Sequence, residues 1–96
     1  MNKGQVTSAM GKIIDAFKLF NEAHKMLRQN NVSICGLSLK GEFMCEYDEV
    51  QLYEGIDNLA KILGKGLAED ECRRNVYFVV GKTKFFECVQ GDGSHR

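Results

Sequence analysis

The chain has 96 residues, of which 44% are hydrophobic and 27% are charged, with 13 basic residues, 13 acidic residues and no proline. This balance excludes a disordered or fibrous protein, and the zero net charge excludes a global field that would draw the molecule to nucleic acid or to an acidic membrane. No apolar run reaches the roughly 18 residues of a membrane span and no leader resembles a signal peptide, so we expect one cytoplasmic domain with a single hydrophobic core.

An amphipathic helix over residues 6–27 is the first element that the sequence predicts. Its apolar residues recur at intervals that place them on one stripe of a helix. These residues are Val6, Met10, Ile13, Phe17, Phe20 and Leu27. We expect Thr7 or Ser8 to cap the start of the helix, and we expect the stripe to face the core. His24 lies on the same stripe, where a partly buried residue at the edge of the core is a more common role than a ligand.

A β-hairpin is predicted over residues 32–47. A three-residue loop at 39–41, with Gly41 in the left-handed region, gives the two strands a register in which apolar side chains share one face. In that register Cys35 lies opposite Cys45, so these two thiols are the pair that oxidation could join. The lack of a secretory leader favours reduced thiols instead.

A second helix is predicted after this hairpin. Asp48 and Gln51 have the spacing of a capping box. The apolar residues that follow at helical intervals are Leu52, Ile56, Leu59, Ala60 and Leu63. Gly64 is expected to end the helix, since glycine is favoured just past a helix end. An alternative remains open at residues 50–53, whose alternation could extend the sheet and leave a shorter helix that starts near Glu54.

A second β-hairpin is predicted after a polar connector over residues 68–74. The run 76–80 is rich in β-branched and aromatic residues, which favour strands. Gly81 and Lys82 supply a two-residue turn, and residues 84–89 return as the partner strand.

The order helix, hairpin, helix, hairpin predicts an α+β fold of the form αββαββ. We expect a four-stranded antiparallel sheet with two helices packed on one face, because that arrangement buries both helical stripes and leaves the other sheet face solvated. The single domain spans residues 1–96, with an ordered core over about residues 6–89. Residues 90–96 have nothing apolar to bury, so this segment is predicted to be a flexible tail.

Motifs for catalysis and metal binding are missing from the sequence. The four cysteines lack the close pairs that present two thiolates to one zinc ion, and free cysteines are commonly small core residues. His24 and His95 lie on a helix stripe and in the tail, where neither is expected beside a nucleophile. We therefore expect a protein that is not an enzyme and that needs no cofactor and no metal ion.

An acidic segment is the most distinctive charge pattern, because residues 41–60 contain six acids and no base. Carboxylates so arranged could imitate the phosphate spacing of a nucleic acid and occupy the basic groove of a partner protein. The predicted partner-binding residues are Glu42, Glu46, Asp48, Glu49, Glu54 and Asp57. A merely solvated helix face is the more common explanation of such a cluster.

Two further binding modes remain open. Basic side chains beside aromatic ones on the second hairpin could bind a nucleotide or single-stranded nucleic acid by charge and stacking. The residues concerned are Arg73, Arg74, Tyr77, Lys82 and Lys84. In the other mode the chain is a self-assembling structural module that forms a homodimer through exposed apolar residues such as Met44 and Tyr53.

Residues 50–60, together with the Gly81 turn and Lys84-Phe85-Phe86, resemble small proteins carried by phages and prophages of Gram-positive gut bacteria. The resemblance implies a phage origin and a setting in the host cytoplasm. Small phage proteins such as anti-CRISPR and other counter-defence inhibitors act by occupying the surface of a host protein. The resemblance thus implies a non-enzymatic inhibitor of a host defence or nucleic-acid-handling enzyme, such as a nuclease, with the acidic residues as its docking face.

Overall fold

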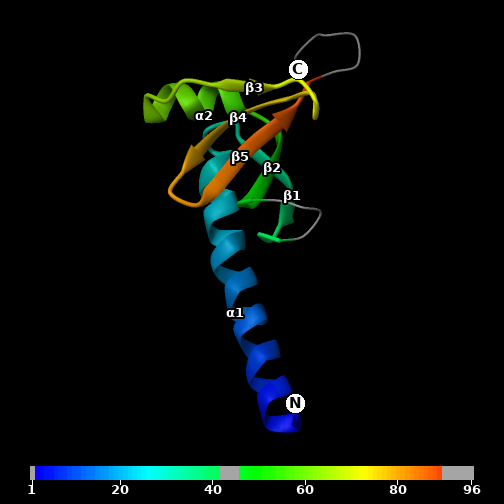
Figure 1. Cartoon of the computed structure of the whole chain (residues 1–96). Helices are drawn as coiled ribbons and strands as arrows, with labels where there is room; N and C mark the ends of the chain where they lie inside the picture. The colour runs from blue at the N-terminus through cyan, green and yellow to red at the C-terminus, as the bar shows by residue number, and fades with distance from the viewer. Residues whose placement is uncertain (1, 42–45, 90–96) are drawn as a thin grey trace.

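The computed structural model describes residues 2–41 and 46–89. Within these residues the chain forms two helices and one five-stranded sheet with the strand order β1-β2-β5-β4-β3 (Figure 1). The elements are α1 (Lys3–Arg28), β1 (Ser33–Ser38), β2 (Asp48–Glu54), α2 (Ile56–Leu63), β3 (Ala68–Asp70), β4 (Asn75–Val80) and β5 (Thr83–Cys88). The predicted α+β class is confirmed. The four-stranded antiparallel sheet is wrong, because the sheet has a fifth strand and β2 runs parallel to β5.

Helix α1 begins earlier than predicted, because a capping box precedes it. The Oδ1 atom of Asn2 accepts a hydrogen bond from the backbone N–H of Gln5 at 2.8 Å, and the Oε1 atom of Gln5 accepts one from the backbone N–H of Asn2 at 3.1 Å. These bonds satisfy two backbone donors that the first helical turn would otherwise leave unpaired. The helix therefore starts at Lys3, and Thr7 and Ser8 lie inside it rather than at its cap.

Strand β1 pairs with a later segment than the sequence predicted. It runs antiparallel to β2, with Ile34 opposite Leu52. Residues 48–54 thus form a strand instead of the first turns of a helix, and the alternative left open for residues 50–53 is confirmed. Val50 and Leu52 alternate with more polar side chains, and a strand places them together on the core face.

The predicted pairing of Cys35 with Cys45 cannot be followed, because residues 42–45 lie outside the described residues. Glu46 and Tyr47, which the prediction placed in the second strand, form a bend just before β2. Cys35 lies at an irregularity of β1, where the register with β2 shifts. The flexible tail predicted over residues 90–96 likewise lies outside the described part of the chain.

The second hairpin is present where the sequence predicted it. Strands β4 and β5 pair antiparallel from Asn75 opposite Cys88 to Val80 opposite Thr83. Gly81, with a φ of 60°, opens the two-residue turn between them. The segment predicted as a polar connector contains β3, a short edge strand that pairs antiparallel with β4.

Helix α2 is anchored at its N-terminus by a residue of the sheet. The backbone N–H of Ile56 donates a hydrogen bond to the Oε1 atom of Glu87 on β5 at 3.1 Å, which supplies the cap that Gly55 cannot provide. Gly55 has a φ of 98°, and a Cβ there would lie 2.5 Å from the carbonyl oxygen of Asn31. Gly64, with a φ of 69°, ends the helix as predicted.

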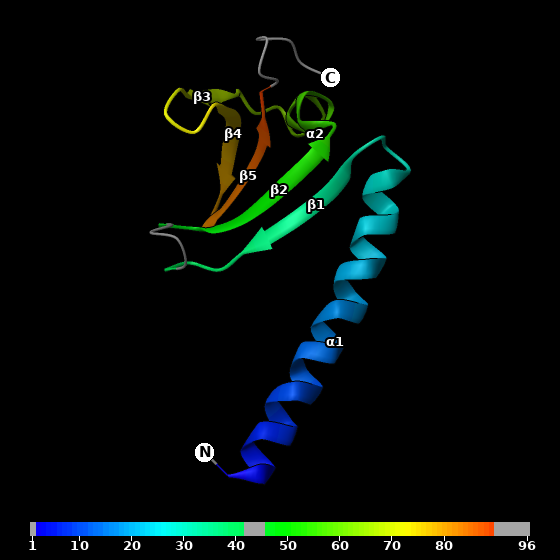
Figure 2. The same cartoon turned by 90° about the vertical axis from the view of Figure 1, so that its right-hand side faces the viewer.

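The hydrophobic core lies between α2 and one face of the sheet. Its buried side chains are Val32, Leu52, Ile56, Ala60, Val76 and Phe78. Leu27, near the end of α1, is partly buried against them, but no described residue of α1 is buried. Most of α1 projects away from the sheet (Figure 2), and the longest dimension of the molecule is 49 Å. The expectation that the apolar stripe of α1 faces the core is therefore wrong for most of its length.

Candidate functional site

The acidic residues predicted as a docking face occupy separate places. Glu46 and Asp48 are exposed at one end of β2, whereas Glu54 and Asp57 are exposed at its other end and on α2. A strand of this length separates its two ends by about 20 Å. Glu42 lies outside the described residues. The four exposed acids thus form two small groups rather than one continuous surface.

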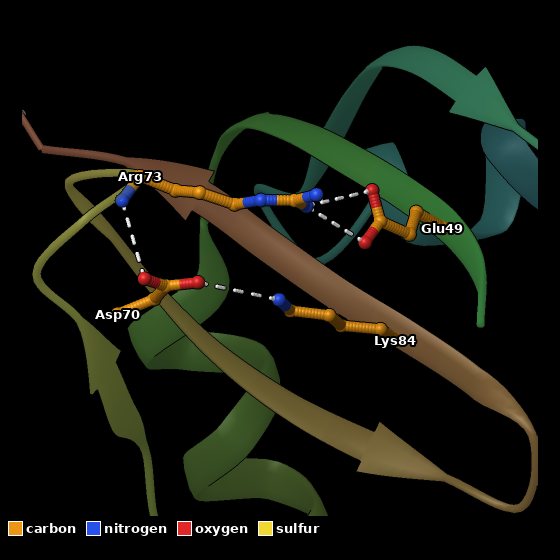
Figure 3. A network of polar contacts seen from close by, with 4 residues as sticks. All are labelled: Glu49, Asp70, Arg73 and Lys84. Atoms are coloured by element: carbon orange, nitrogen blue, oxygen red, sulfur yellow. Dashed lines mark hydrogen bonds and ion pairs between the residues drawn. The ribbon is translucent and has the colours of Figure 1, made fainter. Parts of the chain in front are cut away.

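The sixth acid, Glu49, belongs to a charged network on the sheet (Figure 3). Glu49 is 6% exposed, and its Oε1 and Oε2 atoms accept hydrogen bonds from Nη1 of Arg73 at 3.4 and 3.1 Å. The backbone N–H of Arg73 donates to Oδ1 of Asp70 at 3.1 Å, and Oδ2 of Asp70 lies 3.9 Å from Nζ of Lys84. The network ties β2 and β5 to the turn between β3 and β4.

Two of the residues predicted to bind a nucleotide, Arg73 and Lys84, belong to this network. The charges of Arg73 and Lys84 are both opposed by carboxylates, and Nζ of Lys84 lies 4.3 Å from the ring centroid of Tyr77. A phosphate group placed here would meet the same carboxylates, so the arrangement favours a structural role over phosphate binding. Lys82 is exposed in the turn between β4 and β5, and Arg74 is exposed just before β4.

A broad apolar surface lies instead on α1. We use the name α1 stripe for the five side chains that form it, which are Val6, Met10, Ile13, Phe17 and Phe20. Met10, Ile13 and Phe17 are 57%, 56% and 56% exposed. Contiguous exposed apolar side chains of this size are typical of interaction surfaces, because removing them from water stabilises a complex relative to the isolated chain.

The α1 stripe follows a strict seven-residue repeat. Its intervals alternate between four and three residues, and the pattern continues through His24 to Leu27. Alanines recur at the same interval beside it, at Ala9, Ala16 and Ala23. A straight helix drifts by about 20° every seven residues, so such a repeat is typical of a helix that faces another long helix. The repeat is visible in the sequence. Spacings of three and four also fit a core-facing helix, so the prediction that the stripe faces the core did not identify the seven-residue repeat.

The C-terminal third of α1 is the part that contacts the sheet. Nε2 of His24 accepts a hydrogen bond from the backbone N–H of Ile34 on β1 at 3.1 Å, and its ring centroid lies 5.9 Å from that of Phe20. His24 is half-buried there, at the core edge as predicted. Nearer the middle of α1, a hollow of about 150 Å³ opens between α1 and β1. We call this hollow the α1–β1 groove. It is lined by Ile13, Ala16, Phe17, Phe20 and Leu37.

The chain exposes more surface than a compact monomer of its mass. Its accessible surface is 7180 Å², whereas about 5,500 Å² is typical of a folded monomer of 10.8 kDa. Its radius of gyration is 15.5 Å, against about 12.5 Å for a compact domain of this length.

Metal ligands do not gather in the described part of the chain, where no group of three His, Cys, Asp or Glu side chains could hold an ion. Neither of the helices within residues 2–41 and 46–89 combines the length and the apolarity that crossing a membrane requires. Comparisons with protein-family models, with curated proteins and with solved structures each find no match to this chain.

Proposed function

We propose that this chain is a self-assembling protein-binding module rather than a catalyst, and that the α1 stripe joins its copies. The seven-residue repeat of exposed apolar side chains is the observation that carries this proposal. A helix laid along the stripe would remove Met10, Ile13 and Phe17 from water, and each half-exposed side chain contributes on the order of 1 kcal/mol when its burial is completed. Four of the five stripe residues are exposed in a single copy and are therefore available for such a contact.

Self-assembly was also predicted through Met44 and Tyr53. Met44 lies outside the described residues, and Tyr53 is exposed on β2. A single exposed tyrosine offers far less apolar surface than a helix with a repeated stripe. The geometry therefore supports self-assembly through α1 in preference to that earlier surface.

Replacing stripe residues by glutamine tests the proposal. The variant with Met10→Gln and Phe17→Gln keeps good helix formers on α1 but removes two apolar side chains from the stripe. We expect the natural chain to sediment as an oligomer whose mass rises with concentration, and we expect the variant to stay monomeric. Sedimentation velocity over a range of concentrations measures the difference, and circular dichroism checks that the sheet remains folded.

The matched control carries the same two glutamines on the outer face of α1, as Ser8→Gln and Glu22→Gln. It should sediment like the natural chain, because its stripe is intact. A natural chain that is monomeric at every concentration, or a stripe variant that assembles as well as the control, would remove the proposal.

Inhibition of a host defence or nucleic-acid-handling enzyme, which the resemblance to phage proteins implies, stays a prediction. The exposed acids that could serve it are Glu46, Asp48, Glu54 and Asp57. Glu49 is unsuited to docking because it is buried against Arg73. An assembled pair would present each group of acids twice, which raises the effective concentration of the second contact on a symmetric target.

A further inference from the structure

Given the proposed self-assembly, on which this step rests, we infer that two copies pair their α1 helices antiparallel, so that the first turns of each α1 close the α1–β1 groove of the other. The occupant of the stripe is thus a second copy of this chain. Each groove is incomplete without the partner, and a two-fold axis relates the two grooves.

The attachment of the sheet to α1 disfavours a parallel pair. His24 and Leu27, which continue the seven-residue repeat, are engaged with β1 and with the core of their own chain. A parallel partner would bring its own sheet to the same end of the helix pair, where the first sheet already covers the repeat (Figure 2). An antiparallel partner places the two sheets at opposite ends and leaves the exposed stripe of each helix to the other.

An antiparallel register exists in which the stripe matches itself. When Met10 of one copy lies beside Ile13 of the other, Val6 lies beside Phe17, because both members of each pair are four residues apart along the helix. The smaller Val6 then packs against the large Phe17 ring, and symmetry repeats both contacts. Lys3 reaches the Phe20 position in the same register and can lay its aliphatic stem on that ring.

The flanks of the stripe carry no charge, so they place no like charges against each other when two identical helices pair. The apolar side chains of the stripe are then left to set the register. The flanking residues are Thr7, Ile14 and Asn21 on one side and Ala9, Ala16 and Ala23 on the other. The alanines add no bulk beyond Cβ, so the two helix axes can approach closely.

The groove extends the contact beyond α1. Leu37 on β1 is 52% exposed and lines the groove beside Phe17 and Phe20. In the antiparallel register these two rings face Val6 and Lys3 of the second copy, so the start of its helix covers the mouth of the groove. A residue of the sheet, Leu37, therefore contributes to the interface. A contact made by the two α1 helices alone would not involve it.

Disulfide linkage between single cysteines tests the orientation. The background chain has serine in place of the four native cysteines, which are Cys35, Cys45, Cys72 and Cys88. One chain then carries Val6→Cys and a second carries Phe17→Cys. Under mild oxidation we expect disulfide-linked dimers when the two chains are mixed and none from either chain alone, because equal positions lie about 16 Å apart in this register.

A control pair with Ser8→Cys and Asp15→Cys has the same offset but lies on the outer face, and its mixture should stay unlinked. Linkage of the Val6→Cys chain with itself would overturn the antiparallel arrangement while leaving self-assembly in place, since parallel helices bring equal positions together. The same holds if the cysteine-free chain sediments as a dimer and the Val6→Cys and Phe17→Cys mixture does not link. A cysteine-free chain that is folded and always monomeric would remove both proposals.

A second measurement uses the chain with its native cysteines. Leu37→Gln should weaken dimerisation about tenfold, because it replaces an apolar side chain by a polar one in each of the two grooves that the partner helix covers. Leu39→Gln is the matched control, since Leu39 follows β1 and does not line the groove. Dimer dissociation constants that are equal for Leu37→Gln and Leu39→Gln would overturn the role of the groove.

Discussion

Gly55 joins β2 to α2 against the backbone of the segment that leaves α1. Its φ of 98° and the 2.5 Å distance from a Cβ at this position to the carbonyl oxygen of Asn31 leave no room for a side chain. We expect Gly55→Ala to lower the free energy of unfolding by about 2 kcal/mol or more, as measured by urea denaturation. Gly66→Ala is the control, because a Cβ there meets nothing within 4 Å. Equal losses in the two variants would contradict this assignment.

Whether a single polar or charged residue is buried or exposed could be predicted only in part from the sequence. An acid in a polar stretch is usually solvated, so Glu49 was assigned to a docking face. Its burial depends on Arg73, which is 24 residues away and reaches it through the turn after β3. Glu87 is 2% exposed because it caps α2 from another element. Local sequence carries no signal for such distant partners, whereas the half-buried state of His24 followed from its place on a stripe.

At the scale of elements, local signals predicted what local interactions decide. The β4–β5 hairpin and the end of α2 at Gly64 follow from turn chemistry within a few residues. At β2 the local signals conflict, because Asp48 and Gln51 match a capping box whereas the alternation of residues 50–53 also fits a strand. Pairing with β1 and β5 decides the structure. Strand β3 is three residues long and holds two acids, so only its pairing with β4 identifies it.

At the junction between α1 and β1, the His24 side chain accepts a hydrogen bond from the backbone N–H of Ile34. We expect His24→Leu, which fills the half-buried position with an apolar side chain, to leave the backbone N–H of Ile34 without this acceptor. The hydrogen exchange of that N–H should become about tenfold faster. His24→Gln retains a side-chain acceptor and should exchange more slowly than the leucine variant. Amide exchange followed by nuclear magnetic resonance measures both, and an unchanged rate in His24→Leu would contradict this role.

At the scale of the whole molecule, the sequence predicted the α+β class but placed the wrong surfaces together. A stripe with spacings of three and four fits both a core and a partner helix, and the choice depends on how much sheet is available to cover it. Helix α1 has 26 residues, or about 39 Å at the rise of an α-helix. Strand β1, its neighbour, has six residues and spans about 20 Å. The sheet is therefore too short to bury the whole stripe.

If α1 pairs as proposed, its exposed N-terminal part should make helix content depend on concentration. Residues 3–10 are all exposed in a single copy, and an isolated helical segment of this length is marginal in water. We expect the helical signal in circular dichroism to rise as the chain is concentrated, in step with the mass measured by sedimentation. In the variant with Met10→Gln and Phe17→Gln the signal should stay at its dilute value. A helical signal that is constant across concentrations in the natural chain would contradict this coupling.

Under the proposed pairing, the projection of α1 would link abundance to shape. A dilute chain would be a small sheet with a frayed N-terminal arm. In a concentrated solution two arms would stabilise each other as a rod with a sheet at either end. Synthesis rate alone could then switch the protein between a short monovalent particle and a long bivalent one, without any modification or ligand.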